Sequence, residues 1–299
     1  MEATTNGFSY GLVTPVVAFV MACLGGALGL RCVTRSLSTV RPWRAGWLAL
    51  ASAAIGSGVW TTHFVAMMGF TIEHAALGYS TAVIYASLGA AVLMVGAGVF
   101  VVGYQGLTGR SLLTGGTITG LGIASMHYLG MAGMRLDGLV EYNTLTVTAS
   151  VAIAVVASVG ALWAAVRGGG LLWSLGASVI MGSAVVGMHY VGMAAMHVKL
   201  AHPAHGTVAD SPARTLAPLL IGPAILLLLA GVVVLCDPFL VAGRRRRPEP
   251  AGIPAPAARG DRADLLPRGG AAAAVPTQRG TGGQVPSGVP APEPSRSAP

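Results

Sequence analysis

Charge is scarce in this sequence. Of its 299 residues, 9% are charged and 54% are hydrophobic, whereas soluble domains have roughly 25% charged and 45–50% apolar residues. This imbalance excludes an ordinary water-soluble fold. The net charge of +8 would favour nucleic acid as a partner of a soluble protein, but here the arginines are confined to short segments between apolar runs and to the C-terminal region. We therefore expect no nucleic-acid partner.

Cysteine and an N-terminal basic segment are also nearly absent. The chain has three cysteines, Cys23, Cys32 and Cys236, and their spacing gives neither a disulfide framework nor a CxxC site. The first ten residues lack the basic region of a secretory signal peptide, so we expect the first apolar run to remain as a membrane span.

Seven apolar runs are long enough to cross a bilayer, which takes roughly 20 helical residues. They cover residues 12–30, 47–70, 80–104, 112–134, 145–166, 171–196 and 216–236. None of the runs contains Asp, Glu, Lys or Arg, and strands or loops exposed to lipid would leave backbone polar groups unpaired. The sequence therefore predicts an all-α, polytopic membrane bundle over residues 1–240. Glycine pairs on shared helix faces, such as Gly25 with Gly29 and Gly116 with Gly120, favour close helix packing.

The basic residues predict the orientation of this bundle in the cytoplasmic membrane. One set of alternate connections holds Arg31, Arg35, Arg41, Arg44, Arg110, Arg167 and the four arginines at 244–247, and the other holds only Arg135, Lys199 and Arg214. We expect the N-terminus outside and the C-terminus in the cytoplasm. Residues 241–299 are rich in Pro, Ala, Gly and Arg, a composition that predicts a disordered tail.

A histidine motif recurs three times. The second, fourth and sixth runs contain WTTHFVAMMGF around His63, ASMHYLGMAGM around His127 and VGMHYVGMAAMH around His189. The histidines are 64 and 62 residues apart, which is the length of one helical hairpin. The sequence therefore predicts three copies of a two-helix repeat followed by one extra helix.

Each motif histidine is followed four residues later by a methionine. Residues at i and i+4 share a helix face, so each helix offers an imidazole beside a thioether. The histidines lie about 22–27 Å along their spans at 1.5 Å per residue, close to the outer surface. The resulting six candidate metal ligands are His63, Met67, His127, Met131, His189 and Met193.

Histidine within a membrane span is rare and usually faces the bundle interior or a watery cavity. Imidazole and thioether ligands select copper, particularly Cu(I), whereas magnesium, calcium and manganese prefer oxygen ligands. Structural zinc normally uses thiolates, which these segments lack. The competing interpretation is that the methionines fill space between helices and the histidines bond to facing hydroxyl or carbonyl groups.

Other residues near the motifs give weaker signals. Met126 and Met188 point about 100° away from the histidines. Met134 and Met196, seven residues after His127 and His189, return to the histidine face nearer the surface. Tyr128 and Tyr190 suit either an interfacial belt or hydrogen bonding around the site. Three histidines, His197, His202 and His205, lie in or next to the connection after the sixth run. They could bind metal ions outside the membrane, but a solvated polar loop explains them equally well. His74 beside Glu73 is similarly weak evidence for metal binding.

The tandem MHY with a following GM resembles the signature of the MHYT domain family of bacterial integral membrane sensors, over about residues 10–240. The resemblance implies seven helices with the motifs near the outer face, copper binding through the motif His and Met residues, and sensing of oxygen, carbon monoxide or nitric oxide. The second and third motifs match fully. The first departs from the pattern at Thr62, Phe64 and Ala66, which puts its contribution of ligands in doubt.

Members of this family are often joined to cytoplasmic enzymes of cyclic di-GMP metabolism or to kinases, and the residues after Cys236 do not suggest such a domain. We therefore expect a non-enzymatic sensor that signals through another protein. Two other classes compete with it. A metal transporter would need a polar or thioether path through both leaflets. The inner halves of the second, fourth and sixth spans offer mainly Gly, Ala, Ser and Thr, which counts against this class. A copper or haem redox enzyme would use His/His or His/Met axial pairs.

Overall fold

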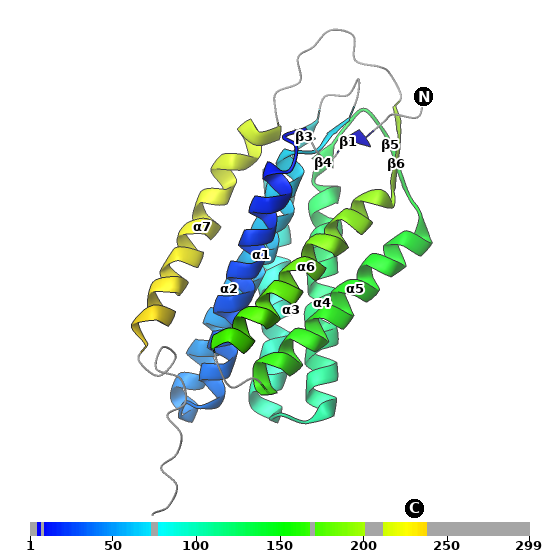
Figure 1. The fold of residues 1–299 in the computed structure, drawn as a ribbon. Helices are drawn as coiled ribbons and strands as arrows, with labels where there is room; N and C mark the ends of the chain where they lie inside the picture. The colour runs from blue at the N-terminus through cyan, green and yellow to red at the C-terminus, as the bar shows by residue number, and fades with distance from the viewer. Residues whose placement is uncertain (1–4, 7–8, 73–76, 168–170, 201–211, 238–299) are drawn as a thin grey trace, which may run out of the picture. The chain divides into compact units, whose positions relative to one another are not determined.

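The structure is a computed structural model that describes residues 5–6, 9–72, 77–167, 171–200 and 212–237. The described residues form seven α-helices: α1 (Val13–Leu37), α2 (Arg41–Met68), α3 (Thr81–Gln105), α4 (Gly109–Ala132), α5 (Thr144–Arg167), α6 (Leu171–Ala194) and α7 (Pro212–Cys236). Each predicted span corresponds to one of them, so the all-α bundle is confirmed (Figure 1). The predicted tail, residues 241–299, lies outside the described residues.

The helices begin and end at sequence signals that apolar run length alone does not reveal. α1 and α2 continue into the arginine-bearing segment between them, up to Leu37 and from Arg41. Pro42 stands in the first turn of α2, where its missing N–H costs nothing. α4 begins with a capping box in which Thr108 and Ser111 each accept a bond from the other's backbone N–H.

Six helices in the described part of the chain are long and apolar enough to cross a membrane, which makes this a multi-pass membrane protein. The helix outside that set is α4, which is as long as the others but carries more Gly, Ser and Thr. Its neighbours α3 and α5 are both in the set, and it packs against each of them. α4 thus occupies the place in the bundle that the fourth predicted span requires.

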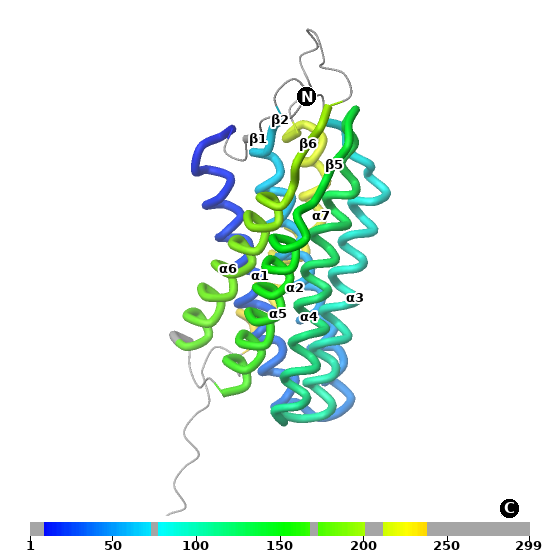
Figure 2. Tube along the Cα trace, turned by 90° about the vertical axis from the view of Figure 1, so that its right-hand side faces the viewer, coloured from blue at the N-terminus to red at the C-terminus, as the bar shows by residue number. Residues whose placement is uncertain are grey.

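The helices of the three hairpins close a ring. α1 packs on α2, α2 on α3, α3 on α4, α4 on α5, α5 on α6, and α6 returns to α1. The seventh helix stands outside this ring against α2 and α1, where Figure 1 shows it in yellow beside the first hairpin. This arrangement agrees with three two-helix repeats plus one added helix, and the view in Figure 2 shows the second and third hairpins side by side.

Glycine allows helices to approach closely within and between hairpins. A Cβ added at Gly25 of α1 would lie 2.6 Å from the Cα of Gly58 in α2, so these two backbones are in direct contact. At Gly120 of α4 an added Cβ would lie 2.5 Å from the Cα of Val155 in α5. The predicted packing through small residues is confirmed at these positions.

Short strands pair at the end of each hairpin that lies beyond the motif histidine. They are β1 (Thr5–Asn6) with β2 (Thr71–Ile72), β3 (Gly78–Tyr79) with β4 (Met134–Arg135), and β5 (Gly138–Tyr142) with β6 (Met196–Leu200). Each antiparallel pair joins the residues before the first helix of a hairpin to those after its second helix. The reason is the need to pair backbone groups where each helix ends.

One backbone hydrogen bond recurs in all three repeats beside these strand pairs. The carbonyl six residues after each motif histidine accepts it, from an N–H that precedes the first helix of the same hairpin. The three bonds run from Ser9 to Gly69 at 3.0 Å, from Ser80 to Gly133 at 2.8 Å and from Asn143 to Ala195 at 2.8 Å. The repeat is therefore one of hydrogen bonding as well as of sequence.

Candidate metal centre

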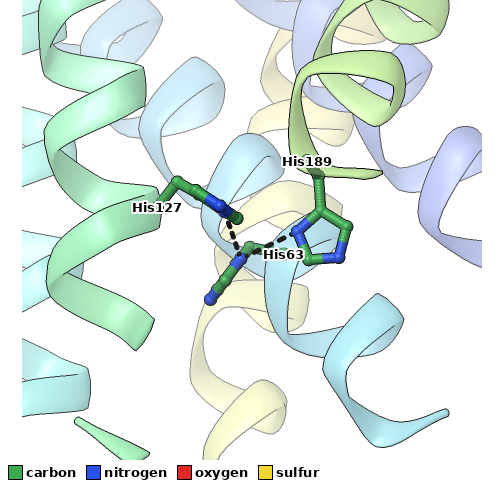
Figure 3. A group of neighbouring side chains, drawn as sticks. All are labelled: His63, His127 and His189. Carbon is green, nitrogen blue, oxygen red and sulfur yellow. Dashed lines mark hydrogen bonds between the residues drawn. The ribbon is translucent and has the colours of Figure 1, made fainter. Parts of the chain in front are cut away.

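The three motif histidines come together in the centre of the ring. His63 lies on α2, His127 on α4 and His189 on α6, and all three side chains are buried. Figure 3 shows the rings converging from three different helices. Three of the six candidate ligands therefore lie together.

Their Nδ1 atoms are the point of closest approach. The Nδ1 of His63 lies 3.0 Å from that of His189 and 3.1 Å from that of His127. The ring centroids form a nearly equilateral triangle with sides of 4.9, 5.0 and 5.1 Å, and each pair of rings is close to perpendicular. The site therefore keeps the threefold symmetry of the repeats down to the orientation of its rings.

The donor set suits a metal ion. Among the described residues, this is the one group of three or more His, Cys, Asp or Glu side chains close enough to share an ion, with one nitrogen per ring all within 4.8 Å of one another. Two nitrogens that bind one ion at 2.0–2.1 Å in tetrahedral geometry are about 3.3 Å apart. Movements of a few tenths of an ångström would convert the observed spacing to that one.

Two ring nitrogens also have no partner on the protein. Among the described residues, the Nε2 atoms of His63 and His127 are buried and make no hydrogen bond. Burying an imidazole nitrogen without a partner costs free energy. The competing interpretation, in which the histidines bond to facing hydroxyl or carbonyl groups, is therefore not supported for these two nitrogens.

The predicted methionine ligands lie on the same three helices, one turn beyond the histidines. Met67 and Met131 are buried in the hydrophobic core, and Met193 is partly buried against it. Their role as ligands remains a prediction. Met126 and Met188, which directly precede two of the histidines, are buried in the same core.

The first motif's departure at Thr62 has a structural explanation. The Thr62 hydroxyl donates to the carbonyls of Ala18 in α1 and Gly58 in α2, at 3.1 and 2.8 Å. This position therefore faces the first hairpin's own outer helix. Replacing methionine by threonine there leaves the histidine cluster intact, because the substituted side chain is directed elsewhere.

Aromatic residues surround the cluster. Phe64, Tyr128 and Tyr190 each make an edge contact with the histidine before them. The hydroxyl of Tyr128 bonds to Ser150 on α5 at 2.6 Å, so it fastens α4 to the next hairpin. His197 lies apart, exposed on β6, and the predicted loop residues His74, His202 and His205 lie outside the described residues.

Two tyrosines on the strands are partly removed from solvent. Burial raises the pKa of Tyr79, on β3, and it also raises the pKa of Tyr142, on β5, with a smaller contribution from Tyr128. Both phenols therefore remain neutral at physiological pH. The histidine cluster itself consists of three imidazoles among the described residues, a donor set that suits a soft or borderline cation better than a hard one.

Comparison with known proteins gives relatives of this repeat. Over 200 residues, 64% of this chain and 29% of the relative, it is 36% identical to MucR of Pseudomonas aeruginosa, a bifunctional diguanylate cyclase/cyclic di-GMP phosphodiesterase. It is 37% identical to the cyclic di-GMP phosphodiesterase NbdA of the same organism over 215 residues, 65% of this chain and 26% of NbdA. The signaling protein YkoW of Bacillus subtilis is 35% identical over 166 residues, 52% of this chain and 20% of YkoW. The chain spans less than a third of the length of these relatives, and no solved structure matches it.

The repeat itself matches a known family. The family described as bacterial signalling protein N terminal repeat, MHYT, matches residues 56–115, 120–178 and 182–251. Each match begins seven residues before one of the three clustered histidines, so the family's unit and the structural repeat have the same period. The matches cover more than half of the sequence, and the chain therefore belongs to the MHYT family of bacterial signalling proteins.

Proposed function

We propose that this protein is a sensor in the cytoplasmic membrane that binds copper between α2, α4 and α6. The observation that carries the proposal is the meeting of three buried Nδ1 atoms from three separate repeats, with spacings of 3.0 and 3.1 Å from His63 to the other two. His63, His127 and His189 would hold the ion, and Met67, Met131 and Met193 are the candidate thioether ligands.

The chemistry of these side chains favours copper over other metals. Neutral imidazole binds copper, zinc, iron and nickel, and thioether sulfur narrows the choice toward Cu(I). Within the described residues, the cluster has no carboxylate or thiolate member, so hard cations and structural zinc are poorly served. A bound copper ion would supply a coordination position for a diatomic gas such as oxygen, carbon monoxide or nitric oxide.

The proposed orientation puts the cluster near the outer face. Arg35 and Arg41 lie at the end of α1 and the start of α2, at the opposite end of the bundle from the strands. Arg135 and Lys199 are on β4 and β6, beside the histidine-bearing ends of the helices. The end richer in arginine faces the cytoplasm under the positive-inside rule, so the N-terminus would be outside.

The proposed output is a change in helix packing that a partner protein detects. Ligand binding shifts a protein only between states that the ligand binds with different affinity, and three rings from three hairpins make ligand affinity depend on how the hairpins sit together. MucR and NbdA are named for enzymes of cyclic di-GMP metabolism, and we propose that this chain informs enzymes of that class. We assign no catalytic role to the helical bundle.

Copper analysis of the purified protein tests the proposal. The full chain in mild detergent would be loaded with Cu(I) under reducing, anaerobic conditions, desalted and analysed for metal. The parent protein is expected to retain copper, and His63→Ala, His127→Ala and His189→Ala are each expected to lose it. His197→Ala is the matched control, because this histidine is exposed on β6 away from the cluster.

Two outcomes would overturn the proposal. One is a parent protein that retains no copper, and the other is retention of copper by all three cluster variants. Helical circular dichroism and the size-exclusion profile of each variant identify loss of copper that results from misfolding. A variant that elutes and absorbs like the parent and lacks copper supports direct ligation.

A further inference from the structure

The glycine three residues after a motif histidine lies against the histidine ring of the preceding repeat. A Cβ built at Gly130, in the second motif, would lie 2.6 Å from the Nε2 of His63. A Cβ built at Gly192, in the third motif, would also overlap the Nε2 of His127. Each glycine therefore makes room for a ring that belongs to another hairpin.

These contacts decide which nitrogen of each ring is open to a ligand. On the side that faces the glycine, each of these Nε2 atoms has no room for even a methyl group, so an ion cannot bind to it from that side. The Nδ1 edges face the other histidines. The two edges of each ring are thus unequal, because one meets backbone and the other meets the centre of the cluster.

We propose that Gly130 and Gly192 are positioning residues that seat the rings of His63 and His127 and leave Nδ1 as the ligating nitrogen. This inference rests on the proposed metal binding and extends it to the atom and to the residues that select it. This would explain the glycine three residues after the motif histidine: because it has no side chain, the histidine ring of the preceding repeat fits against it.

The effect of filling these positions differs from ordinary overpacking. At Gly130 and Gly192 the atoms in the way belong to the far end of a histidine side chain, which can move. At Gly58 the atom in the way is the Cα of Gly25, which cannot. A methyl group at Gly130 or Gly192 therefore displaces a ring and leaves the helices packed.

The first motif has Ala66 at the equivalent position. Ala66 is buried with Ala18 and Val65 in a small apolar cluster, so its methyl group is accommodated by the first hairpin. Two of the three repeats therefore have a glycine that contacts the histidine ring of another repeat. The substitution Ala66→Gly is expected to leave copper affinity unchanged.

Copper titration of the glycine variants tests the inference. Gly130→Ala and Gly192→Ala are expected to weaken Cu(I) binding by about 10–100-fold, the range typical when a group that orients a metal ligand is lost. Gly187→Ala is the matched control on α6, since a Cβ there meets no atom within 4 Å, and it should bind as the parent does. Parent-like affinity in both variants would overturn the inference while leaving the proposed copper site standing.

Nuclear magnetic resonance of ¹⁵N-histidine-labelled protein reports the state of Nδ1 and Nε2 separately, and these signals would not change if the glycines only helped the helices to pack. With Cu(I) bound, Nδ1 of His63 and His127 should show the shift of a coordinated nitrogen and Nε2 that of a protonated one; the reverse assignment would sink the inference. Gly130→Ala should move the His63 ring signals most, and Gly192→Ala those of His127. This variant comparison needs no metal, so it decides the seating role even if the parent binds no copper.

Discussion

The first and third repeats carry the same histidine motif on helices that pack in different ways. In the first, Gly25 and Gly58 bring the backbones of α1 and α2 into contact, and most of α2 is buried. In the third, an apolar groove of about 800 Å³ runs between α5 and α6, lined by small residues such as Ala157, Gly160 and Ala177 together with the larger Trp163 and Trp173. The seventh helix covers the first repeat and leaves the third without such a cover.

The first and third repeats share the structure of their strand ends but differ in how their helices pack. Both hairpins end in the same way at the strands, with equivalent histidines and equivalent backbone hydrogen bonds from Ser9 and Asn143. The two helices of each hairpin nevertheless pack on each other differently along their length. Equivalent histidine positions are therefore kept by hairpins whose internal packing differs.

The largest expected difference comes from adding a methyl group to each repeat. Gly58→Ala places a Cβ against the Cα of Gly25, and overpacking of this kind costs about 1–3 kcal/mol or more. Gly160→Ala adds the same group where nothing lies within 4 Å, and the better helix propensity of alanine should stabilise by up to about 1 kcal/mol. Thermal unfolding in detergent, followed by circular dichroism, measures both. Equal shifts in the two variants would show that the repeats are packed alike.

Two tryptophans make the next comparison. The indole of Trp60, on α2, is fully buried and donates to the Ile84 carbonyl and the Ser87 hydroxyl, both at 3.1 Å. Trp60→Phe removes both of these buried hydrogen bonds and leaves a cavity where the indole stood, although the Ile84 carbonyl still accepts from the Ser87 hydroxyl. It should cost about 1–3 kcal/mol. Trp173→Phe in the third repeat removes an exposed bond to the Ala164 carbonyl and should change stability by less than about 0.5 kcal/mol. The same unfolding experiment decides it, and a larger loss at Trp173 would contradict the comparison.

The smallest effect is expected from the ion pair on the strands of the third repeat. Lys199 lies 2.8 Å from Glu141 with both side chains about half exposed, and exposed pairs contribute roughly 0.2–1 kcal/mol. Lys199→Ala should therefore lower the unfolding temperature slightly, and high salt should remove the difference. A large loss that persists in high salt would mean that the strand pair stabilises the third repeat through more than this contact.

Sequence reasoning predicted the helices and the histidine cluster because both leave periodic signals. Seven apolar runs identify the seven helices, and spacings of 64 and 62 residues place His63, His127 and His189 at equivalent positions. Equivalent positions in repeats that close a ring meet at its centre, so convergence was predictable. The added lengths of α1 and α2 were missed because arginine-bearing turns at a membrane surface are helical without being apolar.

Other features were missed for reasons of chemistry and geometry. The strand pairs are two to five residues long, too short for a reliable pattern, although MHVKL at Met196–Leu200 does alternate buried and exposed side chains. Gly130 and Gly192 carry a visible signal in their shared spacing after the histidines. Its meaning depends on which ring of a different repeat lies opposite, and a linear sequence does not contain that information.

The hydrogen bonds beside the strands constrain how the hairpins move. In each repeat a carbonyl after the second helix is held by an N–H before the first, through Gly69, Gly133 and Ala195, while a short connection joins the two helices at the other end. Every repeat is thus a loop of chain tethered to itself at both ends. A tilt of one histidine-bearing helix would carry its companion along, and each such helix extends about 27–33 Å from its imidazole ring to its far end.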